Sequence, residues 1–236
     1  MKHSAFAISA ALLLSAATPA FCQETDSDVS IQDSAASAMS GTYVGPFGNR
    51  KITICIDRVI GSTITGYSIV AGNERAFSGS WKANAEGYDI TAKEPGDHPA
   101  DGTFTFTFTA KPKSISGKWT PNDKKIGIRE FDLPARVFAY NPKAGKYPQT
   151  SARLLSEKDV ENLKAEDLRI MRNEIYARHG YGFKLADMRE HFDQIEWYMP
   201  VAVDITNKLS KIETKNAELI KRYEKYSAEY YDSFGR

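Results

Sequence analysis

The stretch Thr103-Phe-Thr-Phe-Thr-Phe-Thr109 decides the fold of the first half of this 236-residue chain, because it alternates two residue types without a break. Successive side chains of a β-strand point to opposite faces, so Phe104, Phe106 and Phe108 share one face and the threonines share the other. An aromatic face opposite a polar one is typical of a strand that is buried on one side. We therefore predict a half-buried strand here, with its phenylalanines in a core.

Similar short runs with a period of two lie on both sides of this strand. They cover residues 42–47, 50–57, 62–70, 76–82, 88–92, 113–119 and 125–133. Pairs such as Gly48-Asn49 and Asp101-Gly102 separate the runs, and such pairs favour tight turns. About eight strands at intervals of roughly ten residues, with no helical period between them, predict an antiparallel β-barrel or sandwich over residues 41–140.

A repeated pattern favours the barrel. Gly79-Ser-Trp81 and Gly117-Lys-Trp119 each place a glycine and a tryptophan on the same face of a strand. A glycine allows a neighbouring strand to approach closely, and the tryptophan fills the space beside it. In this architecture the first half loosely resembles small calycin-like barrels. Such barrels are filled by their own side chains or hold one small ligand, and we favour the filled core.

The loop after the 88–92 run gathers polar side chains that could suggest a metal site. They are Glu94, Asp97, His98 and Asp101. Their spacing fits neither a calcium loop nor a zinc motif. The prolines and glycines between them favour a hairpin loop instead. We therefore predict no metal site and no cofactor.

After residue 152 the hydrophobic period becomes helical. Residues 141–152 contain two prolines and a glycine, and we interpret them as a linker. Ser156 and Asp159 have the spacing of a capping box at a helix start. Three apolar stripes follow, made of Leu168, Met171 and Ile175, then of Leu185, Met188, Phe192 and Ile195, then of Ile205, Leu209, Ile212, Ile220 and Tyr223. The sequence thus predicts an α+β chain of two domains, with about four helices over residues 153–228.

The densest local pattern in the second half is Tyr176-Ala-Arg-His-Gly180. Gly180 is placed to adopt the left-handed conformation that ends a helix, and a histidine in the last turn interacts favourably with the helix carbonyls. With this motif intact, the chain resembles the YARHG domain family over about residues 153–226. Surrounding residues that also fit are Arg172, Asn173, Phe183, Phe192, Trp197, Tyr198 and Asn216. The resemblance implies a domain of extracellular bacterial proteins, with no established function and no known catalytic residues.

Two interpretations of the motif remain open. In the first, its side chains bind a ligand such as an anion, and the candidate binding residues are Tyr176, Arg178, His179, Trp197 and Tyr198. In the second, which we favour, Tyr176 packs against aromatic rings, Arg178 pairs with a carboxylate and His179 completes the helix end. Buried asparagines require hydrogen bonds, so we expect Asn173 and Asn216 to bond to neighbouring backbone or to each other.

The N-terminal residues have the features of a secretory signal peptide, which we place at 1–22. A basic start is followed by an apolar run over 5–14 and by small residues, and the run is shorter than the roughly 20 residues that cross a bilayer. Residues 23–40 are interpreted as a flexible tether and 229–236 as a C-terminal tail. Loss of Cys22 leaves Cys55 as the only cysteine, so no internal disulfide forms. The alternative is a lipid anchor on Cys22, which Phe21 just before it disfavours.

The balance of charge excludes some classes of function. The chain has 31 basic and 30 acidic residues, without the bias of a nucleic-acid or membrane-surface binder, and no second apolar stretch is long enough to cross a membrane. We expect a non-enzymatic protein of the bacterial envelope, periplasmic or extracellular, that binds a cell-wall glycan, a partner protein or a small ligand in the barrel. The alternative is a hydrolytic enzyme that acts on a cell-wall polymer with carboxylates of the β half. A concave pocket with convergent carboxylates, or a histidine–acid pair, would favour that alternative.

Overall fold

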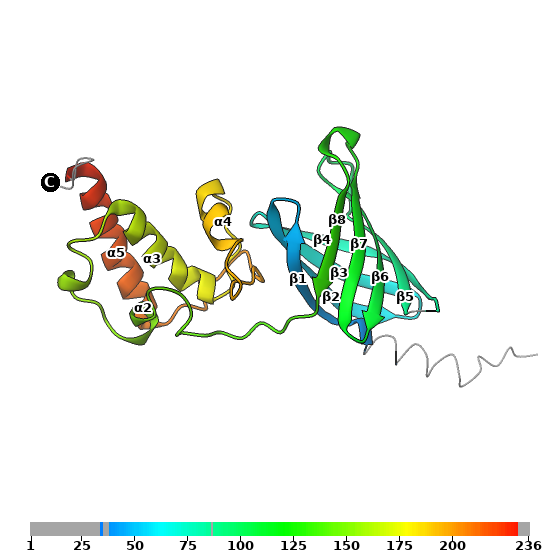
Figure 1. Cartoon of the computed structure of the whole chain (residues 1–236), viewed down its shortest axis with the longest axis horizontal. Helices are drawn as coiled ribbons and strands as arrows, with labels where there is room; N and C mark the ends of the chain where they lie inside the picture. The colour runs from blue at the N-terminus through cyan, green and yellow to red at the C-terminus, as the bar shows by residue number, and fades with distance from the viewer. Residues whose placement is uncertain (1–33, 35–37, 86, 231–236) are drawn as a thin grey trace, which may run out of the picture.

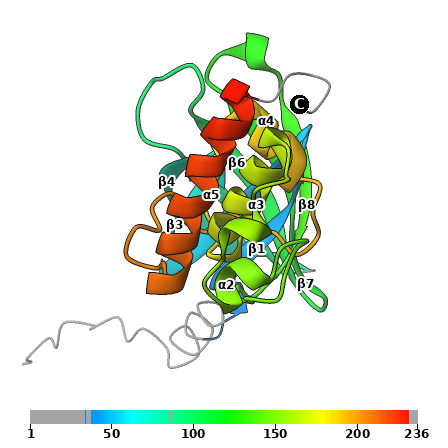
Figure 2. The same cartoon turned by 90° about the vertical axis from the view of Figure 1, so that its left-hand side faces the viewer.

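The computed structural model describes residues 34, 38–85 and 87–230. The predicted signal peptide, most of the tether and the last six residues lie outside this part of the chain. Figure 1 shows two bodies side by side, one built of strands and one of helices, with an extended segment running between them. In Figure 2, seen from the helical end, the helices lie in front of the strands.

Eight strands form a single sheet in which every strand pairs with its neighbours in the sequence, always antiparallel. They are β1 (Gly41–Phe47), β2 (Arg50–Ile60), β3 (Thr63–Val70), β4 (Asn73–Ala83), β5 (Tyr88–Lys93), β6 (Gly102–Ala110), β7 (Lys113–Pro121) and β8 (Arg129–Pro134). The first and last strands meet where Tyr43 forms a bridge with Ala135, and Arg136 N–H donates to the Thr42 carbonyl oxygen at 2.8 Å. The predicted eight-stranded antiparallel barrel is therefore confirmed, as a barrel that is nearly closed.

The phenylalanine face of β6 lies inside this barrel, as the alternation predicts. Phe104, Phe106 and Phe108 are at most 3% exposed, whereas Thr105 between them is exposed. Aromatic and branched side chains from the other strands share the interior, including Tyr43, Phe47, Ile54, Phe77, Ile90, Trp119 and Phe131. Aromatic rings bury 150–250 Å² each, roughly, so this filled interior supplies most of the apolar burial of the domain.

The two glycines of the repeated pattern allow the close approach that we inferred. A β-carbon on Gly117 would lie 2.5 Å from Phe106 Cα and would collide with the Thr105 carbonyl oxygen. A β-carbon on Gly79 would meet the backbone of β5 in the same way, at 2.5 Å from Ala92 Cα. Both glycines therefore lie where the neighbouring strand leaves no room for a side chain.

The start of the last strand differs from the prediction. Lys124–Ile126 forms a 3-10 turn, η1, and β8 begins only at Arg129. The side chain of Asp123 accepts a hydrogen bond from the Lys125 amide, which caps this turn. The sequence pattern included these residues because Ile126 and Ile128 alternate, but both side chains are exposed.

Five helical elements follow the barrel in the described part of the chain. They are α2 (Gln149–Ala152), the 3-10 turn η2 (Glu157–Asp159), α3 (Ala165–Arg178), α4 (Ala186–Phe192) and α5 (Lys211–Tyr230). Helices α3 and α5 lie side by side and share a buried core of Leu168, Met171, Ile175, Ala217 and Ile220. The predicted capping box is present, since the Ser156 amide and hydroxyl both donate to Asp159. The α+β fold class is confirmed.

Two boundaries of the helical part differ from the stripes in the sequence. The last helix starts at Lys211, so Ile205 and Leu209 precede it. Ser210 and Glu213 fix this start, because the Ser210 amide donates to the Glu213 carboxylate and the Glu213 amide donates to the Ser210 hydroxyl. The segment that we interpreted as a linker, 141–152, also holds α2.

Lys51 on β2 connects the barrel to the helical part. Its ammonium donates to the carbonyl oxygens of Ile195, at 2.7 Å, and of Tyr198, at 3.1 Å. Its backbone amide donates to the Asp193 carboxylate at 3.2 Å. Burial lowers the pKa of Lys51 to about 8. A buried cation from one domain thus satisfies two main-chain acceptors of the other.

Replacing Lys51 with methionine is expected to loosen this contact while preserving the length of the side chain. Hydrogen bonds to a charged group contribute about 1.5–3 kcal/mol each, so loss of the ammonium weakens the docking of the two domains. Small-angle scattering should show a larger radius of gyration, and trypsin should cleave faster after Lys143. Lys82→Met, at an exposed position of β4, is the control and should change neither quantity. An unchanged radius for Lys51→Met would contradict the proposed role of this lysine.

Within the described part of the chain, no helix combines the length and the apolar character that a bilayer crossing requires.

Candidate functional site

The Tyr176–Gly180 motif forms the end of α3, as the sequence predicts. His179 is the C-terminal cap, and Gly180 follows with φ at 75°. The Gly180 amide donates to the Ala177 carbonyl at 2.9 Å, and the Tyr181 amide donates to the Tyr176 carbonyl at 3.1 Å. The rings of Tyr176 and Tyr181 also meet edge to face, 6.4 Å apart. These are the two hydrogen bonds and the apolar contact of a Schellman motif.

A side chain at Gly180 has no room. A β-carbon there would collide with Val201 Cγ2 and would lie 3.0 Å from Phe138 Cε2. The positive φ adds a second reason, because other residues adopt the left-handed region at a cost. Gly180 therefore ends the helix and also lets the segment around Phe138 pass close to it.

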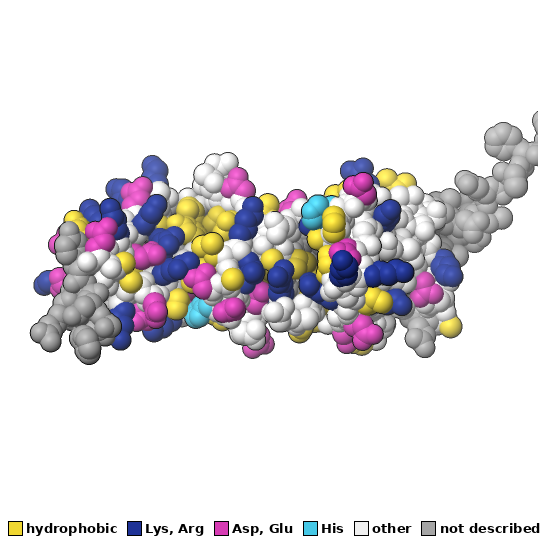
Figure 3. Space-filling view, turned by 90° about the horizontal axis from the view of Figure 1, so that it is seen from above, with side chains coloured by type: hydrophobic (Ala, Val, Ile, Leu, Met, Phe, Trp, Pro, Cys, Tyr) yellow, Lys and Arg dark blue, Asp and Glu magenta, His cyan; other side chains and the backbone are white. Residues whose placement is uncertain are grey.

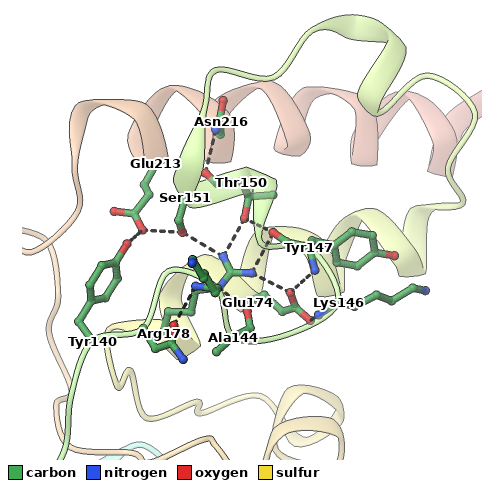
Figure 4. Close-up of polar contacts among 12 residues, drawn as sticks. Tyr140, Ala144, Lys146, Tyr147, Thr150, Ser151, Glu174, Arg178, Glu213 and Asn216 are labelled. Carbon is green, nitrogen blue, oxygen red and sulfur yellow. Dashed lines mark hydrogen bonds and ion pairs between the residues drawn. The ribbon is translucent and has the colours of Figure 1, made fainter.

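Arg178 lies at the centre of the helical part, with its side chain fully buried. Every N–H of its guanidinium donates to an acceptor, namely Ala144 O (2.7 Å), Thr150 Oγ1 (2.8 Å), Ser151 Oγ (3.0 Å), Tyr147 O (2.9 Å) and Glu174 Oε2 (2.9 Å). Figure 4 shows the segment 144–151 curving around the guanidinium. A guanidinium has five N–H donors, so Arg178 has none left for a ligand. Its predicted pairing with a carboxylate is confirmed.

Glu174, one turn before Arg178, completes the arrangement. Its carboxylate is 3% exposed and accepts from the backbone amides of Lys146 and Tyr147, each at 2.8 Å. Glu174 therefore binds the amides of Lys146 and Tyr147, while Arg178 binds the carbonyls of Ala144 and Tyr147 in the same segment. A buried pair whose remaining donors and acceptors are satisfied in this way fixes the chain path around it.

His179 pairs with a buried acid on α5. Its Nε2 lies 2.9 Å from Glu213 Oε2, and the ring of Tyr140 stacks on the imidazole at 4.5 Å. The other oxygen of Glu213 accepts from the hydroxyls of Tyr140, at 2.9 Å, and Ser151, at 2.8 Å. Glu213 thus joins α5, the end of α3 and the segment before α2. The Ser151 hydroxyl donates to Glu213 and not to His179, so the histidine does not activate a serine nucleophile here.

Burial alone would raise the pKa of Glu213, but the hydrogen bonds, the first from the Ser210 amide and the next from His179, outweigh it and leave the pKa below its ordinary value. A carboxyl whose pKa is lowered on folding stabilises the fold above its unfolded pKa, about 4.3 for Glu. This stabilisation is lost as the pH falls through the lower, folded pKa. The Glu213 cluster therefore makes the helical part sensitive to acid.

Replacing Glu213 with glutamine should destabilise the helical part by about 1.5–3 kcal/mol at neutral pH, the range for hydrogen bonds to a charged group. The wild type loses the same contribution as the pH falls through the lowered pKa of Glu213 in the folded state, so the two melting curves should converge in acid. Thermal melts followed by circular dichroism at several pH values measure this difference. Glu218→Gln, at an exposed position of the same helix, serves as the control. A difference that persists unchanged in acid would contradict the assigned role.

The other candidate residues are divided between two places. Tyr198 is 1% exposed, packs on Phe183 and Phe192, and donates its hydroxyl to the Tyr181 carbonyl at 2.7 Å. Burial raises the pKa of Tyr198 far above its ordinary value. Trp197 is half-buried and lines a hollow of about 270 Å³ beneath the segment 136–141. Arg178 lines the same hollow, whereas Tyr176 and Tyr198 belong to the aromatic cluster around Phe183 and Phe192, against which Trp197 also packs.

Both asparagines form the hydrogen bonds that burial requires. Asn173 Nδ2 donates to the Arg169 carbonyl at 2.8 Å. Asn216 Nδ2 donates to the carbonyls of Thr150 and Arg153, at 2.8 and 2.7 Å, and its Oδ1 accepts from the Leu155 amide. The prediction that they bond to neighbouring backbone is confirmed, and Asn216 attaches α2 to α5.

The turn residues around Glu94 predicted a loop position for it, but the structure places its side chain inside the barrel. Glu94 is 3% exposed, while Asp97 and His98 remain at the surface. Asp101 pairs with Arg75 at 2.7 Å. In the part of the chain that the structure describes, no group of three potential metal-binding side chains occurs. The sequence did indicate an inward position for Glu94, because it lies on the same face of the strand as Ile90 and Ala92.

A second concave surface lies on the outer wall of the barrel. It is a shallow groove of about 980 Å³ over strands β5 to β8. Its lining includes the carboxylates Asp89, Glu130 and Asp132. Asp89 is already engaged, since it accepts hydrogen bonds from Asn84 at 2.6 Å and from Thr107 at 2.9 Å.

Comparison with known protein families finds a match that covers the motif and its surroundings. Residues 145–225 match the YARHG domain, so the matched stretch starts within the predicted linker and ends close to the predicted boundary. No curated protein and no solved structure matches the chain.

Proposed function

Because residues 145–225 form a YARHG domain whose motif is used up in internal contacts, we propose that this chain is a non-enzymatic binding protein of the bacterial envelope. The observation that carries the proposal is Arg178, every donor of which is bonded within the protein. The motif builds a rigid scaffold, and recognition of a wall component or partner protein takes place on the exposed surface around it. The barrel supplies a second body, whose interior is filled by its own side chains and whose small end cavity can hold a small ligand.

Further observations support a location in the bacterial envelope and the absence of a nucleic-acid partner. The N-terminal sequence has the basic start and short apolar run of a signal peptide, and Cys55 would be the single cysteine after its removal. Basic and acidic side chains are interspersed over the face seen in Figure 3, without a field of one sign. Export predicts a mature chain that begins near Gln23, which intact mass spectrometry measures.

Sedimentation with purified cell walls tests the proposed binding. The mature chain should pellet with wall material or retain a specific envelope protein on a column, and a high-salt wash should leave part of it bound. The bound fraction of Glu213→Gln, which perturbs the scaffold, is compared with that of Glu218→Gln, its surface control, at an equal fraction of folded protein. A mature chain that stays in the supernatant and retains no envelope protein would overturn the proposal.

The hydrolytic alternative is favoured by two observations, the His179–Glu213 pair and the carboxylates in the groove on the barrel wall. The pair is buried and both its members are engaged, so the groove is the place where a polymer chain would have to be cut. Incubation with purified wall polymer, followed by chromatography of the soluble fraction, tests this activity. Fragments that appear with the wild type and disappear with Asp132→Asn would establish the hydrolase in place of the binding protein.

A further inference from the structure

One end of the barrel contains a small cavity that the proposed scaffold does not use. It has a volume of about 130 Å³ and lies where the β1–β2, β3–β4, β5–β6 and β7–β8 connections meet. Its lining includes Phe47, Arg50, Arg75, Glu94, Trp119 and Arg129. An engineered apolar cavity of about 150 Å³ admits benzene, so this volume accommodates a molecule of about six non-hydrogen atoms or the inner part of a larger one.

Glu94 forms the inner wall of this cavity and has acceptor capacity to spare. Its Oε2 accepts from the Gly102 amide at 2.8 Å and from Trp119 Nε1 at 3.0 Å. Among the described residues, its Oε1 receives one long hydrogen bond, from the Ser68 hydroxyl at 3.3 Å. Burial raises the pKa of Glu94, although the bonds from Trp119 and Gly102 act in the opposite direction. A carboxylate offers about four lone-pair sites, so Oε1 can take a further donor from a ligand.

Arg50 and Arg129 line the outer part of the cavity. Both are half-buried, and among the described residues neither has a carboxylate within ion-pair distance. Arg129 lies over the rings of Phe47 and Trp119, with its Cζ 5.2 and 5.8 Å from the two ring centroids. Arg75, in contrast, is held by Asp101 and by the Ala100 carbonyl.

The surroundings of Arg50 favour the binding of an anion at this position. Burial first, and then the charges of Arg189 and Arg129, hold the pKa of Arg50 below its ordinary value. Asp193 acts in the opposite direction, but its carboxylate already accepts from the Lys51 amide. Guanidinium groups bind carboxylates through two parallel hydrogen bonds, so a ligand carboxylate would relieve this concentration of positive charge.

We propose that this end of the barrel binds a small zwitterion, an amino acid or dipeptide, with its carboxylate at Arg50 and Arg129 and its ammonium at Glu94. The inference rests on the proposed binding role and names the ligand class of the barrel. A simple anion would face the Glu94 carboxylate, and a simple cation would face the two arginines. A ligand with both charges satisfies both ends of the cavity, and a side chain of a few carbon atoms contacts Trp119 and Phe47.

Isothermal titration of the full mature chain tests the proposal with alanine in both enantiomers and with alanyl-alanine. At least one should bind with a Kd of about 1 mM or tighter, and propionate and ethylamine should bind at least about tenfold more weakly. Arg50→Gln and Arg129→Gln should each weaken binding by about tenfold or more, since each removes a charge-assisted contact. Arg58→Gln, at an exposed position of the same strand as Arg50, should bind like the wild type.

Glu94→Gln gives a readout that loss of structure would not produce. The amide oxygen can still accept from Gly102 and Trp119, while the amide nitrogen replaces the oxygen that receives the ammonium. This variant should lose affinity for alanine and gain affinity for propionate. The absence of saturable binding of any zwitterion up to about 10 mM would overturn the inference, as would propionate binding as tightly as alanine. Neither result bears on the sedimentation assay, so failure of the site and failure of the binding role are distinguishable.

Discussion

Replacing Arg178 with methionine is expected to unfold the helical part while the barrel stays folded. The substitution keeps an unbranched side chain of similar length but leaves the Glu174 carboxylate buried without its cation (Figure 4). Removing one partner of a buried ion pair costs about 3–5 kcal/mol. A domain of this length has a total stability of about 4–12 kcal/mol, at roughly 0.05–0.15 kcal/mol per residue. The loss therefore consumes a large part of what holds the helices together.

The two domains carry separate spectroscopic signals, which makes this result measurable. Ellipticity at 222 nm reports mainly on the helices. Near-ultraviolet tryptophan dichroism reports on the barrel, through Trp81 and Trp119, when Trp197 of the helical part is replaced by phenylalanine in every variant compared. The helical transition of Arg178→Met should move to a much lower temperature or disappear, with the tryptophan transition retained. Arg169→Met is the matched control on the same helix, because the Arg169–Asp187 pair is exposed and contributes at most about 1 kcal/mol. Equal melting of the two variants would contradict the central role of Arg178.

Replacing Gly117 with alanine is expected to have a comparable effect on the other domain. The added methyl group would occupy the space of the Thr105 carbonyl and approach Phe106 Cα, and both are backbone atoms of the paired strand β6. Overpacking a core typically costs about 1–3 kcal/mol when side chains can shift, and a backbone strand cannot move without losing ladder hydrogen bonds. We therefore expect a loss of about 3 kcal/mol or more, with the helical transition unchanged.

Denaturant unfolding followed through tryptophan fluorescence, again with Trp197 replaced by phenylalanine, measures the cost of Gly117→Ala. Ser116→Ala is the control, because its side chain is the exposed neighbour on the same strand. Surface substitutions of this kind usually change stability by at most about 0.5 kcal/mol. If Gly117→Ala unfolds at the same denaturant concentration as Ser116→Ala, β6 and β7 are not as close as the structure places them.

The parts of the fold that follow a periodic pattern were predictable from the sequence. The alternation around Phe106 identified the inward face of β6, because burial on one side of a strand imposes a period of two. The motif at Gly180 identified the end of α3, because a left-handed residue there has a strong preference for glycine. Ser156 likewise marked the start of a turn through its capping box.

Other features depend on contacts that the sequence does not display. Four of the five acceptors of Arg178 lie in residues 144–151, two of them backbone carbonyls, and a carbonyl is the same in every residue. The start of α5 was placed too early because Ile205 and Leu209 extend the apolar stripe. The capping box of Ser210 and Glu213 was visible in the sequence and marks the correct boundary. Whether the five candidate residues contact a ligand stays a prediction.

Lys51 bears on how such a domain can be recombined with other partners. The carbonyls of Ile195 and Tyr198 receive their ammonium from a strand far outside the matched stretch 145–225. A gene fusion that joins residues 145–225 to a different N-terminal module inherits these two carbonyl oxygens without the ammonium that binds them. A new neighbouring domain therefore has to present a lysine or arginine at this face, or the two carbonyl oxygens must be hydrated by water. The docking face, rather than the motif, sets which fusions remain compact.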